Sequence, residues 1–439
     1  MSRVCVVGGG GYVGLGYAVA LAHLGHEVVG LDIDACRVAM LKDGVSPVYE
    51  EGLAPLLREG LDSGRLTFTT SYEEAVPVSD IILLCTGTPS LSDGEADLRQ
   101  VRAAATEVGR HLKPGRRTIV VNKSTMPVGA AEMVTSMLEA SVQPGADVRV
   151  VSNPEFLREG RVVHDILHPD RIVLGSDDEE AASAVADMYR GISAPVIMTD
   201  HRSAELIKYA ANAFLATKIS FINDIARLCE RLGADVTVVA DGIGRDPRIG
   251  SRFLQAGIGF GGSCFPKDVG ALTRMAEGAG LHPGLLRAVL EINADARRRF
   301  VARREALLGV LDVKIIGLWG LAFKEGTDDL RESPAIAITE MLLERGATVQ
   351  AHDPQAMPNM TLSHPSLRLC STPLEAATEA DAILLCTAWP EYLELNLSRA
   401  HDLMRGHVMM DGRNVMAPTA AGDAGLRLEG IGRGTHHTH

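Results

Sequence analysis

The sequence lacks the features of a membrane protein or of a secreted, disulfide-rich one. No stretch has the roughly 18 uninterrupted apolar residues that a membrane-spanning helix needs. The N-terminal MSRVCVVGGGG has neither the charged region nor the cleavage site of a signal peptide. The cysteines number seven, an odd count, and form no CxxC pair, so neither a disulfide framework nor a zinc site is predicted. We therefore expect a cytoplasmic protein with no resident metal.

An excess of basic charge is also absent. Lys and Arg number 43 against 56 Asp and Glu, which gives a formal net charge of −13. This balance disfavours binding to nucleic acid or to an anionic membrane, although a local basic site can still hold a small anion. Hydrophobic residues make up 46% of the chain, enough for a large core. The terminal GTHHTH, residues 434–439, predicts a tail outside the fold rather than a metal-binding tract.

What the sequence does contain is an alternation of strands and helices. The apolar runs RVCVVG, EVVGLD, DIILLCTGTP and RTIVVNKST are separated by segments of helical pattern. Such an order predicts a parallel sheet with both faces covered. Residues 312–415 show the same alternation of strands and helices. Gly346 and Asp353 flank a predicted strand with the same spacing as Gly25 and Asp32 flank one in the N-terminal region. We therefore predict an α/β protein with two Rossmann-like doubly wound domains.

The middle of the chain has a different pattern. Residues 203–233 contain no proline, and apolar residues recur at steps of three and four, which predicts one long helix. Residues 270–309 are also predicted to be largely helical. We place the domains at 1–198, 199–300 and 301–439. The long apolar helix is a candidate dimer interface, and packing between domains is the alternative explanation.

A glycine-rich turn follows the first strand. Gly9, Gly11 and Gly14 in GGGYVG fit G-x-G-x-x-G, in which glycines allow the tight turn, the approach of a pyrophosphate and close helix packing. Asp32 ends the second strand, where a carboxylate accepts hydrogen bonds from ribose hydroxyls. The same carboxylate would repel the 2′-phosphate of NADP, so the predicted cofactor is NAD.

Three further motifs carry polar groups. Thr125 in NKSTMPVG is predicted at the carboxyl edge of the sheet, where ligands bind, though a helix cap would explain it equally. Glu155 and Glu159 in NPEFLREG could serve as acid and base, or form a solvated face. Lys208 and Asn212 share a face of the long helix and need partners, either a salt bridge or a bound ligand.

The stretch GIGFGGSCFPKD points to a reaction. Cys264 lies in a glycine-rich run that lets a ligand approach closely, and Lys267 and Asp268 follow it. The other six cysteines mostly resemble small buried hydrophobic residues. A dehydrogenase that continues from aldehyde to acid needs a nucleophile, because hydride leaves readily from a tetrahedral adduct. We therefore predict that Cys264 adds to an aldehyde.

Taken in order, these motifs resemble the UDP-glucose/GDP-mannose dehydrogenase family, and within it the UDP-glucose 6-dehydrogenases. The resemblance covers nearly the whole chain, in GGGYVG, TGTPS, KSTMPVG, SNPEFLREG, ELIKYAANAF, GFGGSCFPKD, GLAFKEGTDDLRESP and DGRN. It implies a four-electron oxidation of the sugar C6 alcohol to a carboxylate, with two NAD reduced, to give UDP-glucuronate for polysaccharide biosynthesis. It also implies a homodimer built on the central helix.

The resemblance also implies residue roles. Cys264 would be the nucleophile, Lys208 and Asp268 would assist proton transfer and oxyanion stabilisation, and Thr125 and Glu155 would place the hydrolytic water. The implied substrate-binding residues are Leu157, Glu159, Asn212, Phe253, Phe260, Lys267, Lys324 and Arg413, with Arg248 from a neighbouring subunit. The implied NAD-binding residues are Gly9, Gly11, Tyr12, Val13, Gly14, Asp32, Thr88, Thr125 and Arg331.

Small departures from the family pattern leave the sugar nucleotide open. MPVG replaces the usual VPVG, and Glu325 and Gly326 stand where proline and asparagine are common. Phe265 after the cysteine favours UDP-glucose or dTDP-glucose over GDP-mannose. A non-catalytic nucleotide-sugar-binding protein is the alternative from another class, and a nucleophile such as Cys264 disfavours it.

Overall fold

The computed structural model describes residues 1–91, 93–364 and 367–433. The chain forms two compact units, Met1–Ala211 and Asn212–His439. The tail GTHHTH lies outside the described residues, so its interpretation stays a prediction.

Unit 1 is built on a sheet with the strand order β3-β2-β1-β4-β5-β6-β7-β8. Its strands are β1 (Arg3–Val7), β2 (Glu27–Leu31), β3 (Leu66–Thr69), β4 (Ile81–Leu84), β5 (Arg117–Asn122), β6 (Asp147–Ser152), β7 (Ile172–Gly175) and β8 (Val196–Thr199). All neighbours pair in parallel except β6 and β7. The first six strands have the 3-2-1-4-5-6 order of a dinucleotide-binding fold.

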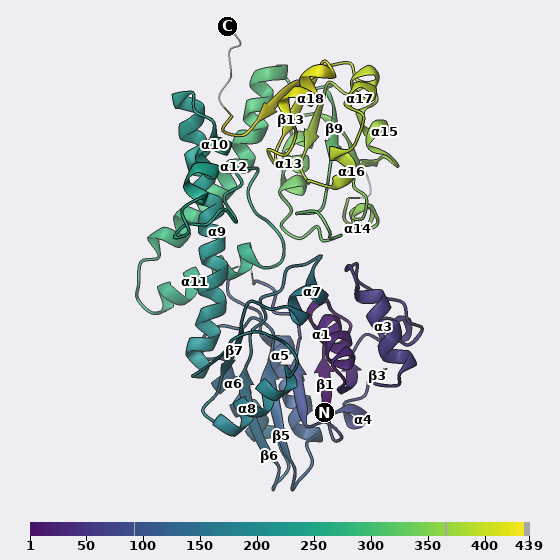
Figure 1. Ribbon diagram of the computed structural model, residues 1–439, viewed down its shortest axis with the longest axis vertical. Coiled ribbons are helices and arrows are strands. Elements are labelled where there is room, and N and C mark those ends of the chain that lie inside the picture. Colours follow the sequence, from purple (N-terminus) through teal and green to yellow (C-terminus); the bar gives the residue numbers. More distant parts are fainter. Residues whose placement is uncertain (92, 365–366, 434–439) are drawn as a thin grey trace. The chain divides into compact units, whose positions relative to one another are not determined.

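Helices cover both faces of this sheet (Figure 1). They are α1 (Tyr12–His23), α2 (Ala35–Lys42), α3 (Leu53–Asp62), α4 (Tyr72–Ala75), α5 (Arg99–His111), α6 (Ala130–Ser141), α7 (Val162–Leu167) and α8 (Glu179–Met188). Because side chains alternate along a strand, Val4 and Val6 of β1 enter the core under α1, whereas Cys5 and Val7 enter the core under α5. Unit 1 therefore has the predicted doubly wound architecture.

Unit 2 contains a second parallel sheet with the order β11-β10-β9-β12-β13-β14. Its strands are β9 (Ile315–Trp319), β10 (Thr348–His352), β11 (Arg368–Leu369), β12 (Ala382–Leu385), β13 (Val408–Asp411) and β14 (Arg427–Gly430). The accompanying helices are α13 (Pro334–Leu343), α14 (Met357–Ser363), α15 (Pro373–Ala377), α16 (Pro390–Leu393), α17 (Leu397–Leu403) and α18 (Pro418–Asp423). This order again reads 3-2-1-4-5-6, so the prediction of two Rossmann-like domains is confirmed.

The central region is helical, as predicted. It consists of α9 (His201–Leu232), the long teal helix of Figure 1, followed by α10 (Val236–Gly244), α11 (Phe265–Gly278) and α12 (Gly284–Leu308). Helix α9 begins two residues before the predicted start, because Asp200 accepts a hydrogen bond from Ser203 N at 2.8 Å. Residues 270–309 are largely helical, as predicted, and are divided between α11 and α12, since Gly280 has φ +76° and Pro283 precedes α12.

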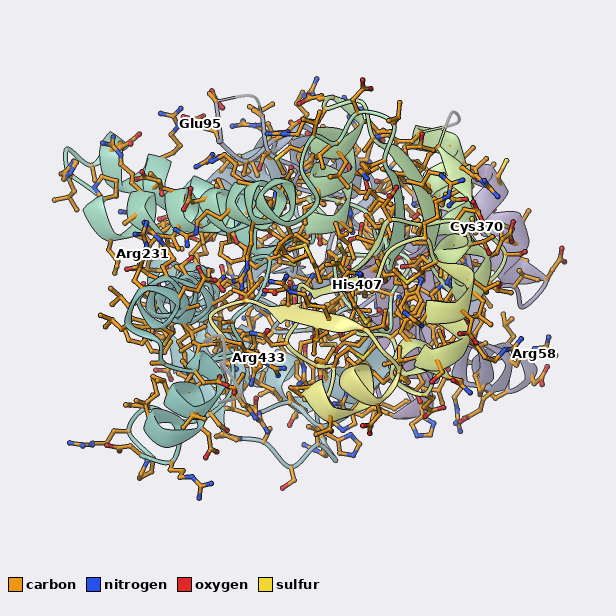
Figure 2. The ribbon with its side chains drawn as sticks, turned by 90° about the horizontal axis from the view of Figure 1, so that it is seen from above. Arg58, Glu95, Arg231, Cys370, His407 and Arg433 are labelled. Atoms are coloured by element: carbon orange, nitrogen blue, oxygen red, sulfur yellow. The ribbon has the colours of Figure 1, made fainter. Side chains whose placement is uncertain are left out.

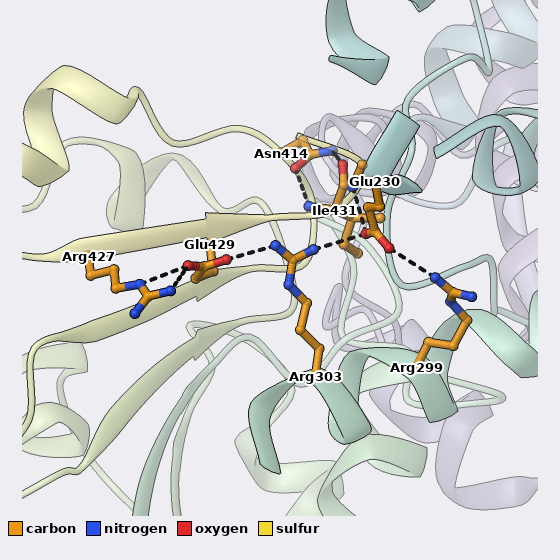
Figure 3. Close-up of polar contacts among 8 residues, drawn as sticks. Glu230, Arg299, Arg303, Asn414, Arg427, Glu429 and Ile431 are labelled. Atoms are coloured by element: carbon orange, nitrogen blue, oxygen red, sulfur yellow. Dashed lines mark hydrogen bonds and ion pairs between the residues drawn. The ribbon is translucent and has the colours of Figure 1, made fainter. Parts of the chain in front are cut away.

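Ion pairs tie the central helices to the C-terminal sheet inside unit 2 (Figure 3). Glu230 on α9 accepts from Arg299 and Arg303 of α12, each at 2.9 Å. Arg303 also donates to Glu429 of β14 at 2.7 Å, and Arg427 donates to the same carboxylate. Figure 2 shows the side chains seen from above, including Arg231 on α9 and Arg433 after β14. The C-terminal part of α9 is therefore joined to the second sheet by charge as well as by packing.

Candidate functional site

The glycine turn in unit 1 brings α1 close to β1. Gly9 N donates to Leu31 O at 2.9 Å, and a Cβ atom on Gly14 would lie 2.1 Å from Gly8 O. A Cβ atom on Gly11 would meet nothing nearer than 3.6 Å. The turn therefore needs glycine for packing at position 14, and at position 11 it leaves the backbone open to a ligand.

Asp32 lies beside this turn. Its carboxylate accepts hydrogen bonds from Gly10 N at 2.9 Å and from Asp34 N at 3.0 Å, and the residue is 7% exposed. Tyr12 and Val13 form the first turn of α1, whose peptide dipoles favour an anion at the N-terminus. These residues fit the pyrophosphate and the adenosine ribose of a dinucleotide.

The two predicted threonines come together at the carboxyl edge of the sheet. Thr88 follows β4, Thr125 follows β5, and Thr88 Oγ1 donates to Thr125 O at 2.9 Å. Both residues are buried. The loop that holds Thr125 is thus fixed to its neighbour, at the edge where open α/β sheets bind ligands.

Lys208 and Glu155 form a buried ion pair in unit 1. Lys208 Nζ lies 3.2 Å from Glu155 Oε1, and Leu157 N donates to Glu155 Oε2 at 2.6 Å. Burial opposes ionisation of Glu155, but the charge of Lys208 and the N–H donor outweigh it and lower the pKa of the carboxyl. Residues 153–158 form no helix, so the half-buried Glu159 does not share a helical face with Glu155.

Lys123 is a buried charge that the sequence analysis did not single out. Its Nζ donates to Asn153 O at 2.8 Å and to Asn153 Oδ1 at 3.0 Å, and it lies 4.3 Å from the centroid of the Tyr17 ring. Burial lowers the pKa of this lysine to about 7. The signal was present, since Lys123 directly follows the apolar strand β5 in the motif that drew attention to Thr125.

In unit 2, Cys264 stands at the start of α11. Cys264 O accepts from Asp268 N at 2.8 Å, which closes the first turn of the helix. Asp268 is fully buried and accepts from Asn212 Nδ2 at 2.6 Å and from Lys267 Nζ at 2.5 Å. A Cβ atom on Gly262 would lie 2.7 Å from the Phe323 ring. The structure thus brings together three of the other predicted residues, Asn212, Lys267 and Asp268, at the start of the helix where the half-exposed Cys264 lies.

The remaining cysteines differ from Cys264. Cys5, Cys85 and Cys386 are buried, and burial raises the pKa of each thiol to about 12. Cys36 is the exception to the predicted burial, because it lies on the exposed face of α2.

A cavity of about 230 Å³ in unit 2 collects predicted substrate residues. Phe253, Phe260, Lys324 and Arg413 line it, together with Phe265, which packs edge-on against Phe260. Aromatic walls with two cationic side chains suit a ligand with a flat ring and anionic groups.

Arg413 supports the walls of this cavity. Its guanidinium donates to Cys386 O at 2.7 Å, to Phe323 O at 2.9 Å and to Gly259 O at 3.1 Å. Burial lowers the pKa of Arg413. The residue joins three segments of unit 2 as well as lining the cavity.

Two predicted residues lie elsewhere in unit 2. The Arg248 side chain is 88% exposed and pairs with Asp246 at 2.5 Å. Arg331 pairs with Asp329 at 2.6 Å and does not line the aromatic cavity. No helix in the described ranges is long and apolar enough to cross a membrane.

The doubly wound sheet, the glycine turn and Asp32 define a dinucleotide-binding dehydrogenase. The chain belongs to the UDP-glucose/GDP-mannose dehydrogenase family. The model of the family's NAD-binding domain matches residues 2–193, that of its central domain residues 202–295, and that of its UDP-binding domain residues 317–418. The chain is therefore an NAD-dependent oxidoreductase.

Individual relatives are similar to this chain over almost its full length. UDP-glucose 6-dehydrogenase TuaD of Bacillus subtilis is 46% identical over 99% of this chain and 94% of its own. The structure of a UDP-glucose dehydrogenase from Pyrobaculum islandicum is 43% identical, with a TM-score of 0.92 over 98% of both chains. A GDP-mannose dehydrogenase from Pseudomonas aeruginosa is 31% identical, with a TM-score of 0.55 over 98% of this chain and 100% of its own.

Proposed function

We propose that this chain oxidises the C6 alcohol of UDP-glucose to the carboxylate of UDP-glucuronate, with two NAD reduced in each turnover. The observation that carries the proposal is the cluster at the start of α11, in which Cys264 is followed by the buried Asp268 and its two partners. A dehydrogenase that stopped at the aldehyde would need no such thiol. The similarity to UDP-glucose 6-dehydrogenases supports UDP-glucose as the substrate.

The glycine turn, Asp32, Thr88, Thr125 and Arg331 would hold NAD, which would supply the hydride acceptor for each oxidation. In the first oxidation Lys208 takes the proton of the C6 hydroxyl as its ammonium group gives up one of its own protons, assisted by Asp268. Cys264 Sγ then adds to C6 of the aldehyde, and hydride leaves from the resulting thiohemiacetal. Thr125 and Glu155 place the water that hydrolyses the thioester, which returns the thiol and yields the carboxylate.

The residues proposed to bind the sugar nucleotide fall into three groups. Phe253, Phe260, Lys324 and Arg413 contact the uridine diphosphate, as the shape and charge of their cavity suit. Leu157, Glu159, Asn212 and Lys267 contact the sugar, and Arg248 comes from the neighbouring subunit.

The proposed partner is a second copy of this chain, bound along α9. Phe214, Phe221 and Leu228 recur at seven-residue steps on one stripe of α9 and are 65%, 49% and 52% exposed. Large exposed apolar stripes of this kind mark interfaces. A reducing cytoplasm suits the protein, because all seven cysteines are free.

The proposal is tested by mixing the protein with NAD and each of UDP-glucose, dTDP-glucose and GDP-mannose, and following NADH by absorbance. We expect UDP-glucose to give the highest kcat/KM and two NADH for each sugar consumed. Preference for another nucleotide would reassign the substrate. Absence of NADH with all three would support a non-catalytic binding protein. Lys208→Ala and Asp268→Ala should each slow turnover by roughly 100-fold or more without unfolding the protein.

A further inference from the structure

A small cavity with a polar lining lies inside unit 1. Its volume is about 10 Å³, which is the space of a single water molecule. Its polar lining comes from Asn122, Ser124, Thr125, Ser152, Glu205 and Lys208. The cavity therefore touches two groups of the proposed chemistry, Thr125 and Lys208, and one carboxyl group that the mechanism does not use, Glu205.

Asn122 indicates what the cavity holds. This residue is 3% exposed, and within the described part of the chain neither its Oδ1 nor its Nδ2 has a hydrogen-bond partner. A buried amide without partners is destabilising. One water molecule in the cavity would supply both a donor and an acceptor to Asn122.

Glu205 is fixed at the wall of this cavity. It is 5% exposed and lies one turn before Lys208 on α9. Its carboxyl group accepts from Gly129 N at 2.8 Å and from Ala131 N at 2.9 Å, at the start of α6. Burial raises the pKa of Glu205 to about 7, and the nearby charge of Glu132 acts in the same direction. Both protonation states of Glu205 are accessible at neutral pH.

A chain of hydrogen bonds leads from Glu205 to a less buried group. Ser152 Oγ donates to Glu205 Oε1 at 3.4 Å and lies 3.1 Å from His201 Nδ1. His201 is half-buried in the first turn of α9. Burial lowers the pKa of His201, while the charges of Asp177, Glu132 and Asp200 oppose that change. The imidazole can therefore accept a proton from Ser152 and release it to solvent.

We propose that Glu205, the cavity water, Ser152 and His201 form a path by which protons leave the catalytic region. This inference rests on the proposed function, which releases one proton in each oxidation and one in the hydrolysis. Lys208 passes its proton to the cavity water, and that water passes one to the carboxylate of Glu205. Glu205 then protonates Ser152 Oγ as the Ser152 hydroxyl proton moves to His201 Nδ1. His201 releases its proton to bulk water, and the path is restored.

Replacing Glu205 with glutamine removes the proton carrier and keeps the side-chain size. We expect Glu205→Gln to lower kcat at least about 10-fold, with the KM for NAD and for the sugar nucleotide within about twofold of the parent. The rise of kcat with pH near 7 should disappear, and the solvent deuterium isotope effect on kcat should increase. Glu139→Gln is the matched control, because Glu139 is exposed on α6, does not line the cavity and is not among the charges that act on Glu205 or His201. An unchanged kcat and pH profile in Glu205→Gln would overturn the proposal.

The outer end of the path is tested by chemical rescue. His201→Ala should lower kcat, and added imidazole should restore it, which a purely structural loss would not allow. If imidazole leaves kcat low, the exit through His201 is wrong. Ser152→Ala should reduce kcat in the same way and serves if the Glu205 variant does not fold.

An infrared titration separates this inference from the proposed function. In the substrate-free protein, the C=O band of a protonated carboxyl group should disappear as pH rises through about 7, and Glu205→Gln should lack that band. This measurement needs no turnover, so it stands even if no sugar nucleotide yields NADH. A parent protein without such a band would show that Glu205 does not hold a proton in this range.

Discussion

The neighbours of Cys264 make it a candidate nucleophile, because all six other cysteines lie in different surroundings. Five of those are buried, and Cys36 is exposed on α2 and does not line the aromatic cavity. Cys264 is half-exposed, precedes a helix and lies four residues before the buried Asp268. Chemistry at this position can therefore be separated from general thiol reactivity by comparing Cys264 with Cys36.

Cys264→Ser is expected to keep NAD and sugar-nucleotide binding but to lose steady turnover by roughly 1000-fold, because a hydroxyl group is a poorer nucleophile and its ester hydrolyses slowly. An acyl-enzyme should accumulate and appear as added mass in intact-protein mass spectrometry. Cys264→Ala should show no adduct, and Cys36→Ser should behave as the parent. Near-parental formation of UDP-glucuronate by the alanine variant would contradict a covalent role.

Asp32 is expected to set the cofactor preference. Asp32→Asn removes the charge that would repel a 2′-phosphate and keeps the side-chain size, so the ratio of kcat/KM for NAD to that for NADP should fall at least about 10-fold. Asp34→Asn, which weakens the cap of α2, should leave the ratio unchanged. A parental ratio in Asp32→Asn would show that the carboxylate does not face the ribose.

Single residues also show which contacts could not be predicted from the sequence. The sequence indicated that Lys208 needs a partner, but the partner, Glu155, is 53 residues away and is brought to it by the fold. Asn122 and Glu205 lie in the motifs NKSTMPVG and ELIKYAANAF, but the sequence gave no reason to single them out, since an amide at the end of a strand and a carboxylate on a helix are common on surfaces. Their significance depends on burial around a shared cavity, which only tertiary packing decides.

At the scale of elements, the turn between β1 and α1 was predictable because glycine spacing has a local steric cause. In this turn, Gly14 allows close packing of α1 on the backbone, whereas Gly11 leaves open space beside the backbone. The start of α9 and the break between α11 and α12 were less predictable, since capping and turn residues compete with a strong helical pattern.

The two glycines should respond differently to a methyl group. Gly14→Ala should destabilise unit 1 by about 3 kcal/mol or more, because its Cβ would lie 2.1 Å from Gly8 O. Gly11→Ala should melt within about 1 °C of the parent, yet weaken NAD binding at least about 10-fold, because the methyl group occupies the approach of the pyrophosphate. Thermal melting and NAD titration of both variants measure this. Equal NAD affinity of Gly11→Ala and the parent would place the cofactor elsewhere.

At the scale of the whole molecule, the two doubly wound domains could be predicted from matched spacings along the sequence. The grouping of the central helices with the C-terminal sheet could not be predicted in this way. The sequence analysis placed a separate domain at 199–300, which stays a prediction, whereas the contacts group the chain from Asn212 onward with the C-terminal sheet. Arg303 and Glu429 pair across 126 residues, and Gly432 N donates to Glu230 across 202 residues, links that no local pattern contains.

Assembly should depend on the apolar stripe of α9. Phe221→Asp should weaken self-association at least about 100-fold, because a carboxylate without a partner would be buried in the interface. Light scattering after size-exclusion chromatography over a range of concentrations measures the change. Leu281→Asp is the control, since Leu281 is 66% exposed but lies outside the stripe. An unchanged assembly in Phe221→Asp would place the interface elsewhere.

Stability should depend on pH through Glu205. Its pKa in the fold, about 7, is raised above the ordinary value of 4.5, so its contribution to stability is present below pH 4.5 and is lost as pH rises through 7. Glu205→Gln should therefore gain roughly 1–3 kcal/mol relative to the parent between pH 5 and 8, measured by denaturant unfolding. The free energy of unfolding of Glu132→Gln should instead fall below that of the parent, because a hydrogen bond from Arg202 lowers the pKa of Glu132. A difference between Glu205→Gln and the parent that does not vary with pH would refute the assignment.

The two sheets share a strand order, and an aspartate follows the equivalent strand in each: Asp32 follows β2 and Asp353 follows β10. The two carboxylates have different hydrogen-bond partners. The Asp353 carboxylate accepts from Leu321 N, Ala322 N, Gln355 N, Ala356 N and Trp389 Nε1, so its lone pairs are taken up by its own domain. The carboxylate of Asp32 accepts from two backbone N–H groups. The same position after the second strand is thus an internal brace in the C-terminal domain. A nucleotide at the strand ends of that domain would have to be held by residues other than Asp353, so the repeat of the fold does not carry a repeat of the ribose contact.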